Sequence, residues 1–130
     1  DPSHVDVAAD LRGYGRNLLA YISRARNIEL VRTVIAIAEK FPGVGQDWYR
    51  DGPQRGLGHI RDYLEAQAAE GRLRIDDSLL AARQLQMLLY AGIVNELLYG
   101  VRETPDDAEI GHVVDEAVAT FLARYGTDAA

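Results

Sequence analysis

The chain has 130 residues, 48% of them hydrophobic, which is enough to bury one continuous core, so we expect a single domain over residues 1–130. With 14 basic against 20 acidic residues and a net charge of -6, its surface on average repels phosphate backbones, which argues against DNA binding by this chain alone. The absence of cysteine excludes disulfides, thiolate zinc sites and cysteine nucleophiles.

No apolar stretch is long enough to span a bilayer, and no basic-then-apolar signal segment opens the chain. We therefore expect a cytoplasmic protein without a membrane partner. Because the chain starts at Asp1 rather than at a methionine, we also expect a processed or truncated product with a further segment upstream.

Apolar residues at three- and four-residue spacing predict helices in the first half of the chain. The first helix is predicted over residues 5–24 and the second over residues 28–41, ending at Pro42–Gly43 because proline lacks the donor that a helix interior needs. Gln46–Asp51 reads as a further helical turn. Gly52–Pro53 is then expected to bend or restart the chain.

The second half predicts three more helices. One carries Leu57, Ile60 and Leu64 and ends near Gly71, and the stretch 72–76 is a connector too short to be a strand. Asp77 is placed to cap a long fourth helix over residues 79–99, whose apolar residues surround it so completely that it must be covered on more than one side. A fifth helix follows the aspartates at 106–107 and ends at Gly126.

Candidate catalytic and metal-binding residues are few and scattered. His4, His59 and His112 lack metal-ligand spacing. The aspartate pairs 76–77 and 106–107 are explained as helix caps, while Ser23 and Ser78 lack the glycine-flanked setting of a serine nucleophile. We therefore predict no enzyme activity, no metal site and no cofactor.

A set of turn and aromatic residues then runs in order through the middle of the chain. It consists of Phe41–Pro42–Gly43, Trp48–Tyr49, Gly52–Pro53, Leu57, Leu64, Gly71-x-Leu73, Asp77 and Ala81–Ala82. In order and spacing this set resembles the C-terminal domain of TetR/AcrR-type transcriptional regulators, and more narrowly the AefR-like group. Ser78 departs from the proline that the group often has at this first helical position, and Gln86 falls in a stretch that is usually more apolar.

The resemblance implies an all-α, five-helix orthogonal bundle whose first three helices surround a small-molecule pocket. It also implies that the last two helices pair with those of a second copy as a four-helix dimer interface. In such a repressor a helix-turn-helix domain, absent from this chain, binds operator DNA under control of the effector.

The face positions of large side chains predict the ligand-binding residues. Tyrosine and tryptophan on inner helix faces supply apolar walls with a hydrogen-bonding tip, which favours a small, hydrophobic effector. The alternative is that these residues fill the core. The predicted set is Tyr14, Leu18, Tyr21, Val34, Ile37, Trp48, Tyr49, Ile60, Tyr63 and Tyr90.

The last two predicted helices carry the candidate homodimer interface. Small residues on them permit close helix approach, and Asn95 is suited to fix the register. Packing within one chain is the alternative for the same residues. The predicted interface set is Leu88, Gly92, Asn95, Tyr99, Val113, Ala117, Thr120, Phe121 and Arg124.

Two other functions are compatible with the sequence. A stand-alone helical module could recruit a different protein through its apolar helix and have no DNA function. A helical enzyme acting on a hydrophobic substrate would need a convergent acid/base set, which is not found in the sequence.

Overall fold

The computed structural model describes residues 4–130, so the first three residues of the predicted domain, Asp1 included, lie outside the described part. These described residues form seven α-helices and one π-helical segment, which confirms the all-α prediction. No described helix is long and apolar enough to cross a bilayer. The elements are α1 (Val7–Ile22), α2 (Ala25–Ala38), α3 (Pro42–Tyr49), η1 (Arg50–Gln54), α4 (Arg55–Ala69), α5 (Ser78–Tyr90), α6 (Ile93–Leu98) and α7 (Asp107–Tyr125).

Aspartate side chains cap the starts of three helices. The carboxylate of Asp77 accepts a hydrogen bond from the Leu80 backbone N–H at 3.0 Å at the start of α5, and Asp106 does the same for α7. Asp6 caps α1 in the same way. The predicted capping roles are thus confirmed for Asp77 and Asp106, while Asp107 lies in the first turn of α7. Each such cap stabilises its helix by about 1 kcal/mol.

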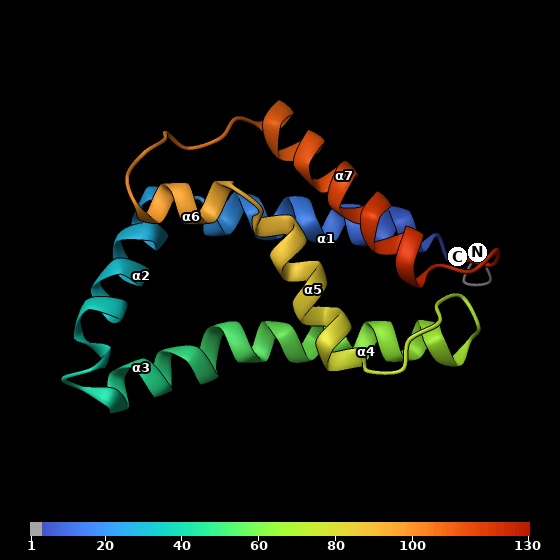
Figure 1. Ribbon diagram of the computed structural model, residues 1–130, viewed down its shortest axis with the longest axis horizontal. Helices are drawn as coiled ribbons and strands as arrows, with labels where there is room; N and C mark the ends of the chain where they lie inside the picture. The colour runs from blue at the N-terminus through green and yellow to red at the C-terminus, as the bar shows by residue number, and fades with distance from the viewer. Residues whose placement is uncertain (1–3) are drawn as a thin grey trace.

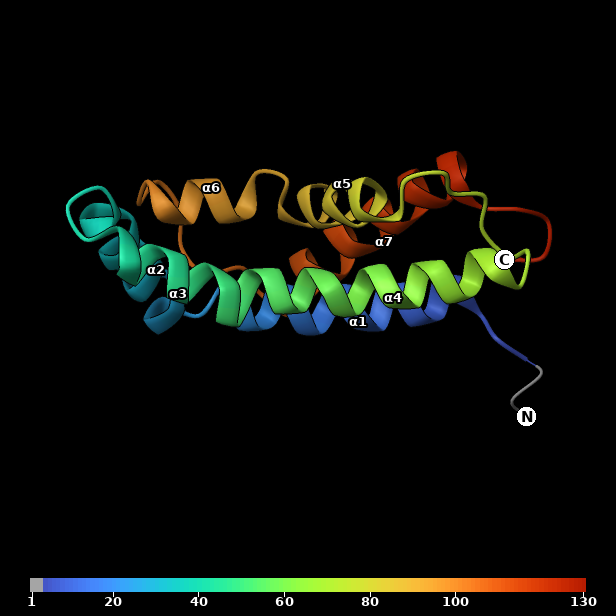
Figure 2. The same ribbon diagram turned by 90° about the horizontal axis from the view of Figure 1, so that it is seen from below.

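The chain does not restart at Gly52–Pro53, but it bends there, and Figure 1 shows α3 inclined to α4. Residues 50–54 form the π-helical turn η1, and α3, η1 and α4 follow one another without interruption as one long helical run (Figures 1 and 2). A π-turn inserts one extra residue into a helix, so a proline without a backbone N–H is tolerated there without ending the run.

The predicted helix over residues 79–99 is two helices. Gly92 has φ +77°, a left-handed conformation that favours glycine, and it separates α5 from α6. After the break α5 packs against α4 and α7, whereas α6 packs against α2 and the end of α5. Most apolar residues of this segment are therefore covered by different helices of the same chain, whereas Leu80, Met87 and Tyr99 remain exposed.

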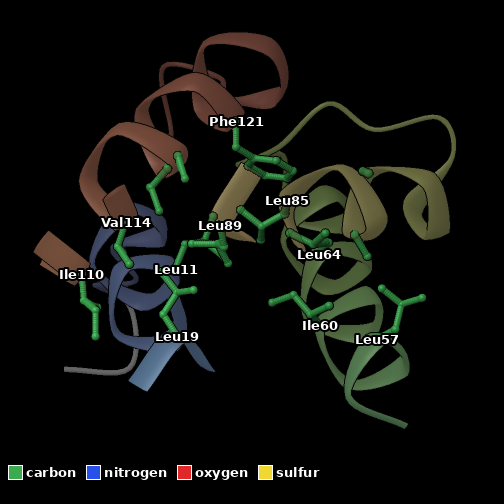
Figure 3. Close-up of a cluster of buried hydrophobic side chains, with 14 of the residues drawn as sticks. Leu11, Leu19, Leu57, Ile60, Leu64, Leu85, Leu89, Ile110, Val114 and Phe121 are labelled. Atoms are coloured by element: carbon green, nitrogen blue, oxygen red, sulfur yellow. The ribbon is translucent and has the colours of Figure 1, made fainter. Parts of the chain in front are cut away.

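The helices lie in two layers. Figure 1 shows α1 and the α3–α4 run as two long sides joined by α2, with α5 crossing between them. In Figure 2, α5, α6 and α7 cover one side of the layer formed by α1 and α4. The core lies between the layers, where side chains such as Leu11, Leu64, Leu85, Val114 and Phe121 are fully buried (Figure 3).

The connector at 72–76 forms no strand, as predicted, but it holds the end of α7. The Arg74 N–H donates to the Tyr125 carbonyl at 2.8 Å, and the Thr127 N–H donates to the Arg72 carbonyl at 3.2 Å. This single bridge fixes the C-terminal end of the chain beside the end of α4.

Candidate functional site

A groove of about 280 Å³ lies between α1 and α4. Its walls come from one face of each helix, because residues four apart on a helix lie on the same side. Three of the predicted ligand-binding residues meet here, two tyrosines and an isoleucine, in a largely apolar surface. The groove is lined by Asp10, Leu11, Tyr14, His59, Ile60 and Tyr63.

A hydrogen bond crosses this groove. The Tyr63 hydroxyl donates to the Asp10 carboxylate at 2.6 Å, linking α4 to α1. Burial of the phenol, the bond to Asp10 and the negative charge of that carboxylate raise the pKa of Tyr63. Tyr63 therefore stays protonated at neutral pH, and its oxygen remains free to accept a hydrogen bond from a ligand.

Three phenols from different helices lie close enough to influence one another. Burial, followed by the effect of Tyr14 on α1, raises the pKa of Tyr90 to about 12, and Tyr49 on α3 adds to the shift. Burial also raises the pKa of Tyr14. Tyr14 thus belongs both to the groove and to a pair of phenols with Tyr90 whose pKa values are raised by burial, and both can donate or accept hydrogen bonds.

The other predicted ligand-binding residues do not line this groove. Leu18 is half-buried against the core, and so is Tyr90, while Val34, Ile37 and Trp48 are half-buried on α2 and α3. Tyr49 is exposed. Tyr21 is also exposed, with the Arg24 guanidinium 5.5 Å above its ring, because its face of α1 is left to solvent near the end of the helix.

Three lining residues were missed by the sequence prediction. Asp10 lies four residues before Tyr14, and His59 lies four residues before Tyr63, so helical spacing from the predicted tyrosines could have identified both. Leu11 is a buried core residue that also borders the groove.

The predicted dimer residues divide into two groups. Gly92, Asn95, Tyr99, Thr120 and Arg124 are exposed, and Leu88 and Val113 are half-buried, so these seven remain open to a partner. The interface prediction is wrong for Ala117 and Phe121, because Phe121 is only 1% exposed and both residues are buried within a single chain. They lie on the face of α7 that packs against α1 and α5, where Figure 3 places Phe121 beside Leu85.

Two exposed apolar residues of α5 were missed by the interface prediction. Leu80 is 47% and Met87 56% exposed, and their seven-residue separation places them on one face of the helix. This face adjoins α7, since the Tyr125 hydroxyl donates to the Gln84 side-chain carbonyl oxygen between them.

No group of three or more histidine, aspartate or glutamate side chains in the described part of the chain is placed to hold a metal. Of the three histidines, His59 alone borders the groove, with Asp10 as the acidic residue of the same lining.

A model of the AefR-like transcriptional repressor C-terminal domain matches residues 9–127. The chain belongs to this AefR-like family. The family is one of transcriptional regulators and not a class of enzymes. Regulators of the wider TetR family act as dimers that bind small-molecule effectors and DNA.

Solved TetR-family structures share the fold of this AefR-like domain. A protein from Mesorhizobium loti assigned to the TetR family has 27% identity and a TM-score of 0.90, over 95% of this chain and 61% of its own. A TetR regulator from Agrobacterium tumefaciens has 27% identity and a TM-score of 0.78, over 94% of this chain and 58% of its own. No curated protein matches the chain.

The flavonoid-responsive regulator FrrA shares the fold alone, with 22% identity and a TM-score of 0.83 over 95% of this chain and 62% of its own. The chain thus spans about three fifths of the length of the structures it resembles.

Proposed function

We propose that the chain is the effector-binding and dimerisation domain of a TetR-type transcriptional repressor, with no catalytic activity of its own. The groove between α1 and α4 binds a small, mainly hydrophobic effector that carries a hydrogen-bonding group. The observation that supports this most is that Tyr14, Ile60 and Tyr63, predicted from separate helix faces, line one groove.

The groove offers both kinds of contact that such an effector needs. Leu11 and Ile60 provide an apolar floor, and burying apolar surface of the effector contributes about 25 cal/mol per Å². The neutral phenols of Tyr14 and Tyr63 provide hydrogen bonds that orient it. In the absence of an effector, the Tyr63–Asp10 bond keeps the polar atoms satisfied.

Effector binding is tested by thermal shift and calorimetry with a panel of small hydrophobic compounds, including planar polyphenols because one structural relative is named for its flavonoid response. We expect at least one class to raise the melting temperature saturably. The variant His59→Trp fills the mouth of the groove and should abolish that response. Ala69→Trp adds the same bulk to an exposed position on the same helix and should leave it intact.

Loss of the response in both tryptophan variants would mean that the added ring acts through the stability of α4 and not through the groove. No response from any compound class would contradict the effector proposal. Association with a different protein in that case would favour the interaction module instead.

Dimerisation is proposed to use the joint surface of α5 and α7. Its exposed members include Leu80, Met87, Thr120 and Arg124, and two apolar side chains left open on one helix face favour burial against a second copy. Leu88 and Val113 are half-buried on the same two helices and extend the apolar contact.

Sedimentation velocity tests the dimer. We expect the wild-type domain to sediment as a dimer at micromolar concentration and the double variant Leu80→Glu/Met87→Glu to sediment as a monomer, because charges in an apolar interface are costly to bury. Ile35→Glu is the matched control, since Ile35 is 62% exposed on α2 and away from α5 and α7. A monomeric wild-type domain would contradict the proposal.

In the whole protein, a helix-turn-helix domain outside this chain is proposed to bind operator DNA in the cytoplasm. The effector then acts by population shift, favouring the dimer geometry to which it binds more tightly. Reading the frame upstream of the codon for Asp1 tests this directly. A basic helix-turn-helix pattern is the expected result, and a start codon close to Asp1 would overturn it.

A further inference from the structure

A second groove, of about 320 Å³, lies on the side of the molecule opposite the two termini. It is formed by the α1–α2 junction, the end of α6 and the loop that follows α6. Figure 1 shows this loop rising beside the start of α2. Its lining includes Ser23, Ile28, Glu29, Arg32, Leu97 and Glu103.

The two arginines of this groove are already engaged. Arg32 donates from Nε to the Leu98 carbonyl at 2.9 Å, and a second nitrogen donates to the Leu97 carbonyl. Arg102 bonds the carboxylate of Glu109 at 2.5 Å and lies 3.6 Å from Glu96. Arg102 is thus neutralised by two carboxylates, whereas Arg32 is held by two backbone carbonyls at the end of α6.

The two glutamates of the same groove have no such partners. Within residues 4–130, the carboxylates of Glu29 and Glu103 make no ion pair and no hydrogen bond. Glu29 comes from α2 and Glu103 from the loop after α6, so negative charge is presented from two sides of one groove.

A buried polar group lies in the lining as well. Ser23 is 1% exposed, and its Oγ has no hydrogen-bond partner among the described residues. A buried hydroxyl without a partner is uncommon in native structures, and a ligand or water frequently satisfies it. Ile28 and Leu97 flank it with apolar surface.

We propose that this groove is a second ligand site, separate from the effector groove, that binds a short aliphatic amine with two cationic groups. The ammonium groups pair with the carboxylates of Glu29 and Glu103, the aliphatic chain lies on Ile28 and Leu97, and the Ser23 hydroxyl accepts a hydrogen bond from an ammonium N–H. An anion is disfavoured, because Glu29 and Glu103 have no partner and the two carboxylates that hold Arg102 bring the region to four negative groups against two positive ones.

Calorimetry at low ionic strength tests the site, with 1,4-diaminobutane as the probe. 1,4-Butanediol and succinate keep the four-carbon length and replace the two cations by neutral and anionic groups. We expect saturable binding of the diamine with a stoichiometry of one per chain and no binding of the diol or of succinate. Equal binding of the diol, or no saturable heat with the diamine, would overturn the proposal.

Variants distinguish binding at this site from nonspecific attraction of a cation to an acidic protein. Glu29→Gln/Glu103→Gln should weaken diamine binding by roughly fivefold, the loss expected from two exposed ion pairs. Glu70→Gln, at an exposed position after α4, should leave it unchanged. Identical affinities for wild type and the double variant would mean that no specific site exists.

Two further variants test the floor of the groove and its independence. Ser23→Ala should weaken diamine binding without loss of folding, because alanine fits the same buried space. His59→Trp, which fills the effector groove, should leave diamine binding intact. If His59→Trp abolished it, the diamine would be binding in the effector groove and the second site would be wrong.

Discussion

Two regions of the molecule differ in how much they bury. The packed half consists of α1, α4, α5 and α7, and each of these helices has several buried side chains. The arm consists of α2, α3 and η1 and buries almost none. Leu11, Leu64, Leu85 and Val114 are fully buried in the packed half. In the arm, Ile28 is the one buried residue of α2, and neither α3 nor η1 has any.

Polar contacts hold the arm near its start, and at its other end η1 continues directly into α4. The Asn27 side chain donates to the Ile22 carbonyl at 3.0 Å, and Arg32 holds the last carbonyls of α6. Elements with few buried apolar contacts open at low free energy, whereas a closely packed core does not. We therefore expect the arm to open more readily than the packed half.

Shortening an apolar side chain is expected to change the free energy of unfolding very differently in the two regions, and this is the largest expected effect. Phe121→Ala in α7 should lower the free energy of unfolding by about 3–5 kcal/mol, because it leaves a cavity among fully buried neighbours. Ile35→Ala in the arm should change it by no more than about 0.5 kcal/mol. Urea unfolding at a fixed protein concentration measures both, and equal losses would remove the distinction.

Gly13 and Gly15 in α1 test how closely the helices of the packed half approach one another. A Cβ at Gly15 would lie 2.7 Å from Leu89 Cδ2 and 3.0 Å from Val114 Cγ1, both buried, whereas a Cβ at Gly13 would meet nothing within 4 Å. Gly15→Ala should therefore destabilise by about 1–3 kcal/mol. Gly13→Ala should stabilise by about 0.5–1 kcal/mol, since glycine weakens a helix interior.

Thermal and urea unfolding of the two glycine variants should move in opposite directions. Shifts of the same sign would mean that backbone propensity and not helix contact governs α1.

The sequence predicts the local features of both regions well. Asp77 and Asp106 are caps because a carboxylate before a helix meets free N–H groups whatever the tertiary structure is. Helical period places Tyr14, Ile60 and Tyr63 each on the inner face of its own helix, and the packing of α1 and α4 then brings these faces to one groove.

The features that the sequence does not predict are those that depend on contacts between helices. A glycine within an apolar helical pattern, such as Gly92, is compatible with a continuous helix and becomes a break only through its φ of +77°. An apolar stripe does not say which partner covers it, so Phe121 fits a dimer interface as well as a core until α1 and α5 are placed. Pro53 similarly allows a bend or a restart of the chain, and only the π-turn shows that the helical run continues.

Tyr90 reports on the boundary where the packed half meets the arm. Its folded-state pKa is about 12, against about 10 for an unfolded tyrosine, so the folded chain keeps a proton that the unfolded chain loses. The resulting stability is complete below pH 10 and is lost as pH rises towards 12. Between pH 8 and pH 11 the free energy of unfolding of Tyr90→Phe should therefore fall by about 1 kcal/mol less than that of the wild type.

Urea unfolding at the two pH values measures this difference. Identical alkaline losses for wild type and Tyr90→Phe would mean that this phenol is not held neutral by its surroundings.

The smallest expected effect concerns the attachment of the arm itself. Arg32→Met keeps the aliphatic stem but removes both hydrogen bonds to the end of α6, so amide hydrogen exchange in α2 should become about two- to fivefold faster, as expected for one or two exposed hydrogen bonds. Exchange in α1 and α7 should not change, because their protection depends on the packed half. Arg26→Met, at an exposed position of the same helix, is the control and should exchange as wild type does. Faster exchange throughout all the helices of Arg32→Met would mean that the arm and the packed half unfold as one unit.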